Sequence, residues 1–169
     1  STLSSADFIV EKGLSVLPEY SYINLSGMTF TSSPEDASNY HSYLEYLTDN
    51  NDNTSWEPAG AKELTTYTLT LNLKTTKDLH GLKLVQTYFD NVNKRSWCPQ
   101  SVKIYVSTDG VKWDVATYVE ELEIGHSTGE VNIIPFIEGG VQAQYVKVLV
   151  PTPHSESTYN ISLAEIGLY

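Results

Sequence analysis

Hydrophobic and polar residues alternate along most of this 169-residue chain. In residues 66–73, for example, Tyr67, Leu69 and Leu71 alternate with threonines. Because successive side chains of a strand point to opposite faces, this pattern predicts a half-buried β-strand. The same reasoning predicts further strands over residues 82–86, 102–107, 113–119, 131–136, 145–150 and 161–169.

Helical periodicity is confined to one segment, from Pro34 to Leu47. Its apolar residues Tyr40, Tyr43, Leu44 and Leu47 recur at helical spacing, which predicts one short helix near residues 38–47. Strand-like segments joined by turns such as Asp109-Gly110, without alternating helices, are typical of an antiparallel β-sandwich or barrel. The chain is therefore predicted to be all-β.

Residues 1–30 have a weaker pattern. Phe8–Val10 and Ile23–Phe30 fit two more strands, or the whole segment fits a lead-in from a preceding domain. We expect a single domain over residues 1–169, with a core of about residues 38–169. Since the chain begins at Ser1 without a methionine, we also expect it to be a piece of a larger, multidomain protein.

The charge and composition narrow the possible partners. The formal net charge of −11 disfavours nucleic acid and anionic membranes, whose phosphates would repel the protein, and it suits divalent cations. No apolar run approaches the roughly 20 residues of a membrane span, so we expect no membrane insertion. Cys98 is the only cysteine, which excludes a disulfide within the chain.

The stretch Asp49–Trp56 carries side-chain oxygens on every residue before the tryptophan. Such side chains compete for backbone hydrogen bonds and predict a loop. Calcium takes six to eight oxygen ligands, so the loop fits either a calcium site or a solvated turn. An EF-hand is excluded, because its required glycine and glutamate positions hold Thr54 and Gly60.

One motif has the form of a hydrolase nucleophile. Residues 125–129, Gly-His-Ser-Thr-Gly, match G-x-S-x-G, and Glu138 and His154 follow in the order of an α/β-hydrolase. That chemistry requires a strand-to-helix turn above a parallel sheet, whereas residues 130–136 alternate as a strand. A glycine-rich hairpin turn is the favoured interpretation, and nothing in the sequence requires an enzyme.

Aromatic side chains beside amide and basic groups suggest a binding surface. The candidates are Tyr88, Asn93, Arg95 and Trp97 in the loop between two predicted strands, and His154 and Tyr159 before the last strand. Long loops on a rigid scaffold often carry ligand sites. An aromatic ring can pack on the C–H face of a sugar while the polar groups bond its hydroxyls. Alternatively, Tyr88 and Trp97 cap the end of the core.

These features together resemble the discoidin family, also called the coagulation factor V/VIII (F5/8) C-type domain, and within it the family-32 carbohydrate-binding modules. The family pattern contains D-G-N-x-x-T-x-W, a strand with a D-L-G-like turn, S-x-D-G-x-x-W, a strand near R-Y-V-R-I and a terminal E-I-x-x-Y. This chain has, in the same order, Asp49–Trp56, Leu71–Leu73, Ser107–Trp113, Tyr145–Val148 and Glu165–Tyr169.

The resemblance implies a jelly-roll β-sandwich of the galactose-binding-domain type with one structural calcium ion. It implies the following ligands: side chains of Asp49, Asp52, Thr54 and Glu165, and backbone carbonyls near Leu47 and Ala164. Asn50 replaces a family glycine, which asparagine tolerates where φ is positive. Galactose-binding members carry an arginine where this chain has Gln86-Thr87-Tyr88, and Arg95 is the nearest arginine.

The function expected from the sequence is a non-catalytic carbohydrate-binding module with a glycan or glycoconjugate as partner. The ligand residues expected are Trp97, Arg95, Asn93, Tyr88, His154 and Tyr159. We expect the parent protein to be bacterial and secreted or at the cell surface, including the outer membrane. The alternative is a protein-interaction or adhesion domain of the same fold that binds no sugar.

Overall fold

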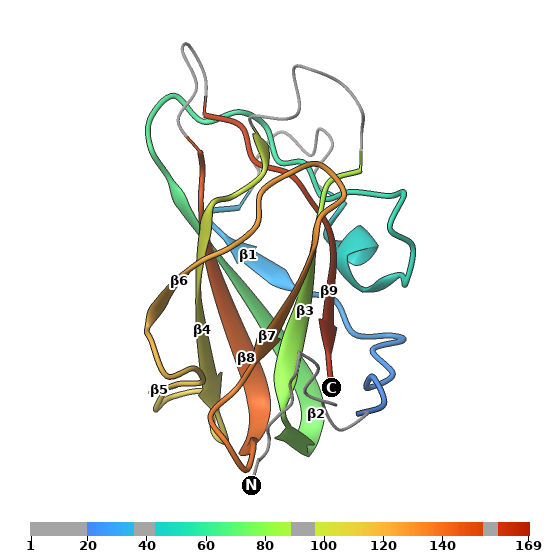
Figure 1. Ribbon diagram of the computed structural model, residues 1–169, viewed down its shortest axis with the longest axis vertical. Helices are drawn as coiled ribbons and strands as arrows, with labels where there is room; N and C mark the ends of the chain where they lie inside the picture. Colours follow the sequence, from blue (N-terminus) through green and yellow to red (C-terminus); the bar gives the residue numbers. More distant parts are fainter. Residues whose placement is uncertain (1–19, 36–42, 89–96, 154–158) are drawn as a thin grey trace, which may run out of the picture.

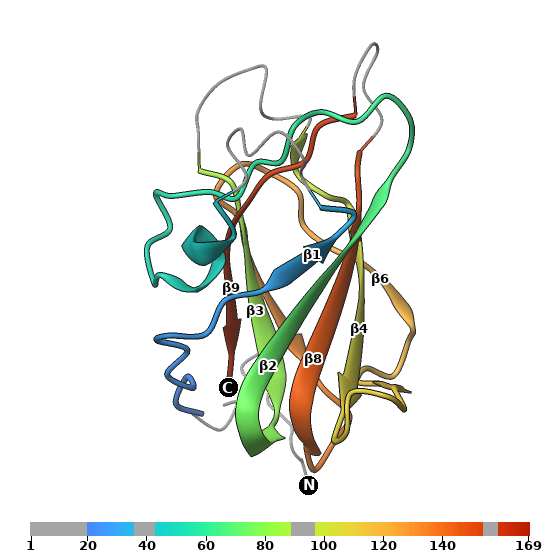
Figure 2. The ribbon, with the colours of Figure 1, turned by 180° about the vertical axis from the view of Figure 1, so that it is seen from behind.

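The computed structural model describes residues 20–35, 43–88, 97–153 and 159–169. In these residues two antiparallel sheets face each other (Figures 1 and 2). The larger sheet has the order β1 (Thr31–Ser33), β2 (Thr66–Leu79), β8 (Val141–Pro151), β4 (Ser101–Ser107) and β5 (Asp114–Val115), and β6 (Glu121–Glu123) also pairs with β4. The smaller sheet has the order β7 (Val131–Pro135), β3 (Gly81–Gln86) and β9 (Leu163–Leu168). The predicted all-β antiparallel sandwich is confirmed.

The core lies between the two sheets and follows the alternation of the sequence. In β2, Leu69, Leu71 and Leu73 have no exposed surface, whereas Thr70 and Asn72 between them are half-buried and exposed, respectively. Leu82 and Leu84 of β3 are equally buried in the facing sheet. Each such leucine contributes about 1.5–3 kcal/mol through burial, which is why the alternating pattern identified these strands.

The strand β2 is longer than the sequence pattern indicated. It pairs with β8 up to Asn72, loses register, and pairs again from Lys77 to Leu79. Lys74, between the two ladders, has a φ of 75°, which marks an irregularity in the strand. Residues 74–76 are polar and exposed, so the hydrophobic pattern does not predict that pairing resumes beyond them.

Two segments differ from their expected structure. The return strand expected over residues 113–119 is reduced to β5, because Thr117 Oγ1 donates to Val119 O (2.7 Å) and the chain turns away. Residues Ile23–Phe30 form no strand, and β1 begins only at Thr31.

The described part of the predicted helix is a 3-10 helix, η1 (Leu44–Thr48), while residues 36–42 lie outside the described residues. Leu47 of η1 is fully buried and η1 packs against β9. No helix among the described residues has the length and apolar character needed to cross a membrane.

Residues 20–30 lie against the end of the smaller sheet. The backbone N–H of Ile23 donates to Leu168 O (2.8 Å), and the side chains of Leu25 and Phe30 belong to the buried core. Phe8–Val10 fall outside the described residues. The interpretation of residues 1–30 as a lead-in from another domain stays a prediction.

Candidate functional site

The Asp/Asn loop after η1 is fixed to the last strand by Trp56. Its backbone exchanges two hydrogen bonds with Leu163, at 2.8 and 3.1 Å, in an isolated bridge beside β9. The Trp56 side chain is 1% exposed and packs edge-on against Tyr67, with ring centroids 5.3 Å apart. The tryptophan that ends the motif is therefore an anchor in the core.

The loop before Trp56 is shaped by its own side chains. Asp49 accepts hydrogen bonds from the Asn51 N–H (Oδ1, 3.0 Å) and from the Thr54 hydroxyl (Oδ2, 2.6 Å). Asn51 Oδ1 accepts a bond from the Asn53 N–H (2.9 Å). These are the side-chain-to-backbone turns that Asp and Asn favour. Asn50 has a φ of 57°, as its replacement of a family glycine requires.

Glu165 of β9 faces this loop and is 5% exposed. Its Oε2 accepts a hydrogen bond from the Asn50 N–H (3.1 Å), whereas its buried Oε1 has no hydrogen-bond partner in the structure. Burial raises the pKa of Glu165 to about 8. The bond from Asn50 opposes this rise, and the neighbouring Asp49 carboxylate adds to it.

The carboxyl groups of Asp49 and Glu165 repel each other when both are ionised, and Glu165 Oε1 is buried without a hydrogen-bond partner. This arrangement favours a bound cation. A hard cation would satisfy Glu165 Oε1 and remove the repulsion from Asp49. Among the described residues, no group of three His, Cys, Asp or Glu side chains could hold a metal. A cation here would therefore also need the Thr54 hydroxyl and backbone carbonyls as ligands.

The structure gives weaker support for the other residues that were expected to bind the metal. Asp52 is exposed, and no hydrogen bond or ion pair connects it to Glu165. Leu47 and Ala164 have buried side chains in η1 and β9, which pack together, so only their backbone carbonyls are candidate ligands.

A cleft of about 700 Å³ lies beside the Asp49–Glu165 cluster. Asp49, Glu165 and the segment 22–29 are among the residues that line it.

Of the expected ligand-binding residues, the three that the structure describes, Tyr88, Trp97 and Tyr159, lie at one end of the sandwich. Since β3 is antiparallel to both β7 and β9, the end of β3 lies beside the starts of its two neighbours (Figure 1). Tyr88 follows β3, the turn 125–130 precedes β7, and Tyr159 precedes β9. Trp97 joins them from the larger sheet, because its carbonyl accepts a bond from the Ser162 N–H (3.0 Å). We call this region the loop end.

The three described aromatic residues of the loop end differ in exposure. Tyr88 is 63% exposed and lies across Gly129, where a Cβ would come within 3.0 Å of the tyrosine ring. Trp97 is half-buried. Tyr159 is also half-buried, and its backbone pairs with that of Ala61. Tyr88 is therefore a surface residue and does not cap the core. Asn93, Arg95 and His154 lie outside the described residues.

A buried amide supports the loop end and was not identified from the sequence. Gln86 has no exposed surface, and its Nε2 donates to Pro99 O and to Gly125 O, both at 2.9 Å. These bonds connect the end of β3 to the segments that lead into β4 and β7. The available signal was a glutamine at an otherwise apolar strand position, where a buried polar group needs partners.

The G-x-S-x-G motif lies in a turn of the loop end. The Glu130 N–H donates to Ser127 O (3.1 Å), and Gly129 has a φ of 74°. The turn leads into the antiparallel strand β7 and not into a helix. The expected glycine-rich turn is present, but it is not a hairpin, because β6 pairs with β4 of the larger sheet and β7 pairs with β3 of the smaller sheet. The geometry also differs from that of a nucleophile elbow.

The F5/8 type C domain model matches residues 29–165, so this chain belongs to the F5/8 type C domain family. Solved structures share the fold at low sequence identity. CpGH89CBM32-5 from Clostridium perfringens, in complex with GalNAc-β-1,3-galactose, has a TM-score of 0.70 at 18% identity, with 88% of this chain and 99% of that chain covered.

Two further structures agree. The family 32 CBM from C. perfringens NanJ, in complex with galactose, has a TM-score of 0.67 at 18% identity and covers 87% and 96% of the two chains. The C-terminal domain of a chitobiase from Bacteroides fragilis has a TM-score of 0.67 at 14% identity and covers 88% and 97%. No curated protein matches the chain significantly.

Proposed function

We propose that this F5/8 type C domain is a non-catalytic module that binds glycans at its loop end. The observation that carries the proposal is the exposed Tyr88 ring, which lies over the Gly129 turn at the same end of the sandwich as Trp97 and Tyr159. An exposed ring that is already fixed loses little conformational freedom when a sugar packs on it. The sugar-bound structures of similar fold support the same class of ligand.

Asn93, Arg95 and His154 are the proposed partners of the sugar hydroxyls, from the same two loops of the sequence. Arg95 is the nearest arginine to the position where galactose-binding relatives carry one. We also propose that the parent protein is bacterial and secreted or at the cell surface. The net charge of −11 disfavours the membrane-binding function known in other discoidin domains.

A glycan array tests the proposal on the intact domain. Binding to a defined set of glycans in wild-type protein, absent in Tyr88→Ala, is the expected result. A control variant, Val111→Ala, changes a side chain that is 79% exposed on a hairpin outside the loop end and should bind as wild type does. An array without any positive glycan would overturn the proposal in favour of a protein-interaction domain.

Calcium is the cation proposed for the Asp49–Glu165 cluster, with a structural role. It would join the Asp/Asn loop to the last strand, and a ligand that binds only the folded state stabilises that state. The unpartnered Oε1 of Glu165 supports this proposal. Calcium should raise the melting temperature, a chelator should reverse the effect, and Asp49→Ala should abolish it. A melting temperature that calcium does not change would overturn the proposal.

A further inference from the structure

We propose that the domain has a second glycan site, for neutral saccharides, in an aromatic groove at the end of the sandwich opposite the loop end. The groove has a volume of about 790 Å³ and lies where β3 begins and where β7 and β9 end. Its lining includes Tyr20, Tyr22, His80, Tyr118, Glu138 and Tyr169. The six residues of β3 separate it from Tyr88 by about 20 Å at the usual rise of a strand.

Three exposed tyrosines line the groove. Tyr118 is 73% exposed, Tyr22 is 50% exposed and Tyr20 is 42% exposed. Aromatic rings with accessible faces can pack on the C–H face of a sugar, and their hydroxyls can donate or accept hydrogen bonds. The groove therefore offers the two kinds of contact that a saccharide needs.

The rings are held in place without a ligand. Tyr20 stacks on His80, with centroids 4.2 Å apart and planes 9° apart, and also stacks on Tyr169 at 5.6 Å. Tyr22 packs edge-on against Tyr169 at 5.8 Å. The Tyr118 hydroxyl accepts a bond from the Glu138 N–H (2.8 Å), which leaves its own hydrogen to donate.

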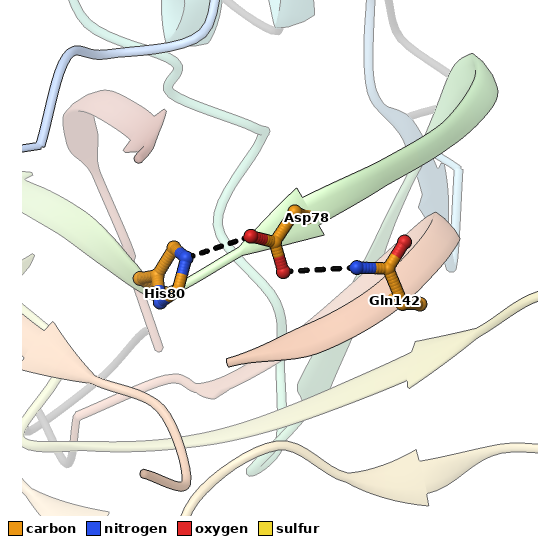
Figure 3. Close-up of polar contacts among 3 residues, drawn as sticks. All are labelled: Asp78, His80 and Gln142. Atoms are coloured by element: carbon orange, nitrogen blue, oxygen red, sulfur yellow. Dashed lines mark hydrogen bonds and ion pairs between the residues drawn. The ribbon is translucent and has the colours of Figure 1, made fainter. Parts of the chain in front are cut away.

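His80 is fixed by a polar chain that crosses from β2 to β8 (Figure 3). Its Nε2 lies 2.9 Å from Asp78 Oδ2, and Asp78 Oδ1 accepts a bond from Gln142 Nε2, also at 2.9 Å. On the other side, a Cβ at Gly140 would lie 2.8 Å from the His80 ring, so only glycine permits this close approach. A site whose rings are ordered in advance loses less entropy on binding.

The charge of the groove favours a neutral saccharide. Glu138 is the acidic residue of its lining, and the described lining contains no lysine or arginine. The nearby Lys83 Nζ lies over the ring of Tyr22, 4.8 Å from its centroid. The net charge of −11 adds to the repulsion of acidic sugars. A volume of about 790 Å³ lies in the range of small-molecule sites.

The proposal rests on the proposed class of ligand, glycans, but not on the loop-end site. Two-dimensional amide NMR separates the two sites, because residues 118, 139 and 140 report on the groove and residues 87, 88 and 129 on the loop end. The probes are galactose, N-acetylgalactosamine, glucose and mannose, with glucuronic acid as the acidic comparison, each at tens of millimolar.

We expect neutral sugars to shift the groove signals in wild type and in Trp97→Ala. Tyr118→Ala should weaken binding in the groove about tenfold or more while the loop-end signals respond as before. Tyr118→Phe keeps the ring and should weaken binding less than Tyr118→Ala does. Val111→Ala, a surface change outside both sites, should behave as wild type.

Each contrary result has a separate meaning. Loop-end shifts without groove shifts would overturn the second site and leave the proposed function intact. Shifts at neither end would overturn the second site and would show that the loop end does not bind these monosaccharides, while the glycan array still decides the proposed function. Groove shifts that survive Tyr118→Ala, or that only glucuronic acid produces, would overturn the assignment of Tyr118 or of the neutral ligand. Groove shifts retained when Trp97→Ala removes the loop-end response would support the second site alone.

Discussion

The backbone N–H of Asn50 donates a hydrogen bond of 3.1 Å to Glu165 Oε2, although 115 positions separate the two residues. This bond joins the Asp/Asn loop to the last strand of the smaller sheet. It also brings a buried carboxyl group next to Asp49, whose charge disfavours ionisation of Glu165. The pairing therefore makes the stability of the domain sensitive to pH and to cations.

In metal-free protein, stability should fall as the pH rises from about 4.5 to about 8. The pKa of Glu165 is raised from 4.5 to about 8, mainly by burial, so the folded state holds a proton that the unfolded state releases between these values. This contribution is fully present below about pH 4.5 and is lost as the pH rises through about 8. Urea unfolding in the presence of a chelator, measured across this window, checks the prediction.

The matched variant is Glu165→Gln, which keeps the shape and removes the titrating group. Its metal-free stability should depend less on pH in this window than that of wild type. An identical pH dependence in the two proteins would show that Glu165 does not cause the effect.

Calcium should stabilise the domain more at about pH 8 than at about pH 5. A cation binds the ionised carboxylate, so at low pH it must displace the proton held by Glu165. Calorimetry with and without calcium measures the difference in melting temperature at each pH. A calcium effect that is equally large at both values would indicate a site that does not include Glu165.

The backbone at position 50 should accept glycine and reject β-branched residues. Asn50 has a φ of 57°, a conformation that costs ordinary residues about 1–2 kcal/mol. Asn50→Gly should therefore be close to wild type in stability, and Asn50→Val should lose at least about 1 kcal/mol, measured by urea unfolding. Asn53→Val, at an exposed position of the same loop, is the control and should change stability less.

The strands that were predicted correctly are those whose own side chains alternate. β2, β4 and β8 pair along one sheet, and each buries one face, so the hydrophobic pattern located them, although β2 and β8 extend beyond the predicted residues. The three-residue strands β1 and β6 have the sequences Thr-Ser-Ser and Glu-Leu-Glu. They are short and largely exposed, and pairing with β2 and β4 rather than their own pattern makes them strands.

The candidate sites depend on contacts that local sequence does not encode. Alternation placed Glu165 in a strand, but its approach to Asn50 follows from the packing of η1 against β9. The family resemblance supplied this pairing. The aromatic groove combines Tyr20, Tyr118 and Tyr169 from three distant segments, and no spacing in the sequence brings them together.

Replacing the buried amide of the loop end should destabilise the fold. Gln86→Leu leaves the Pro99 carbonyl without the bond that it accepts from Gln86, whereas Gly125 O keeps its second bond, from Asn132 Nδ2, and we expect a cost of about 1–3 kcal/mol. Urea unfolding measures the loss. Gln100→Leu, at an exposed position nearby, should stay within about 0.5 kcal/mol of wild type. Equal effects of the two substitutions would show that the Gln86 bonds contribute little.

Tyr88 and Trp97 should separate ligand binding from stability at the loop end. Tyr88 is 63% exposed, so Tyr88→Ala removes a surface ring and should leave the melting temperature unchanged. Trp97 is half-buried, so Trp97→Ala should abolish binding with only a small loss of stability. We expect the loop-end aromatics to contact only one side of a sugar, which predicts a Kd of about 0.1–1 mM, or roughly −4 to −5.5 kcal/mol. Titration calorimetry with a glycan from the array measures the Kd, and a thermal melt of each variant measures its stability.

If Tyr88→Ala binds as wild type does, Tyr88 is not part of the site. If Trp97→Ala unfolds the domain, the Trp97 ring belongs to the core.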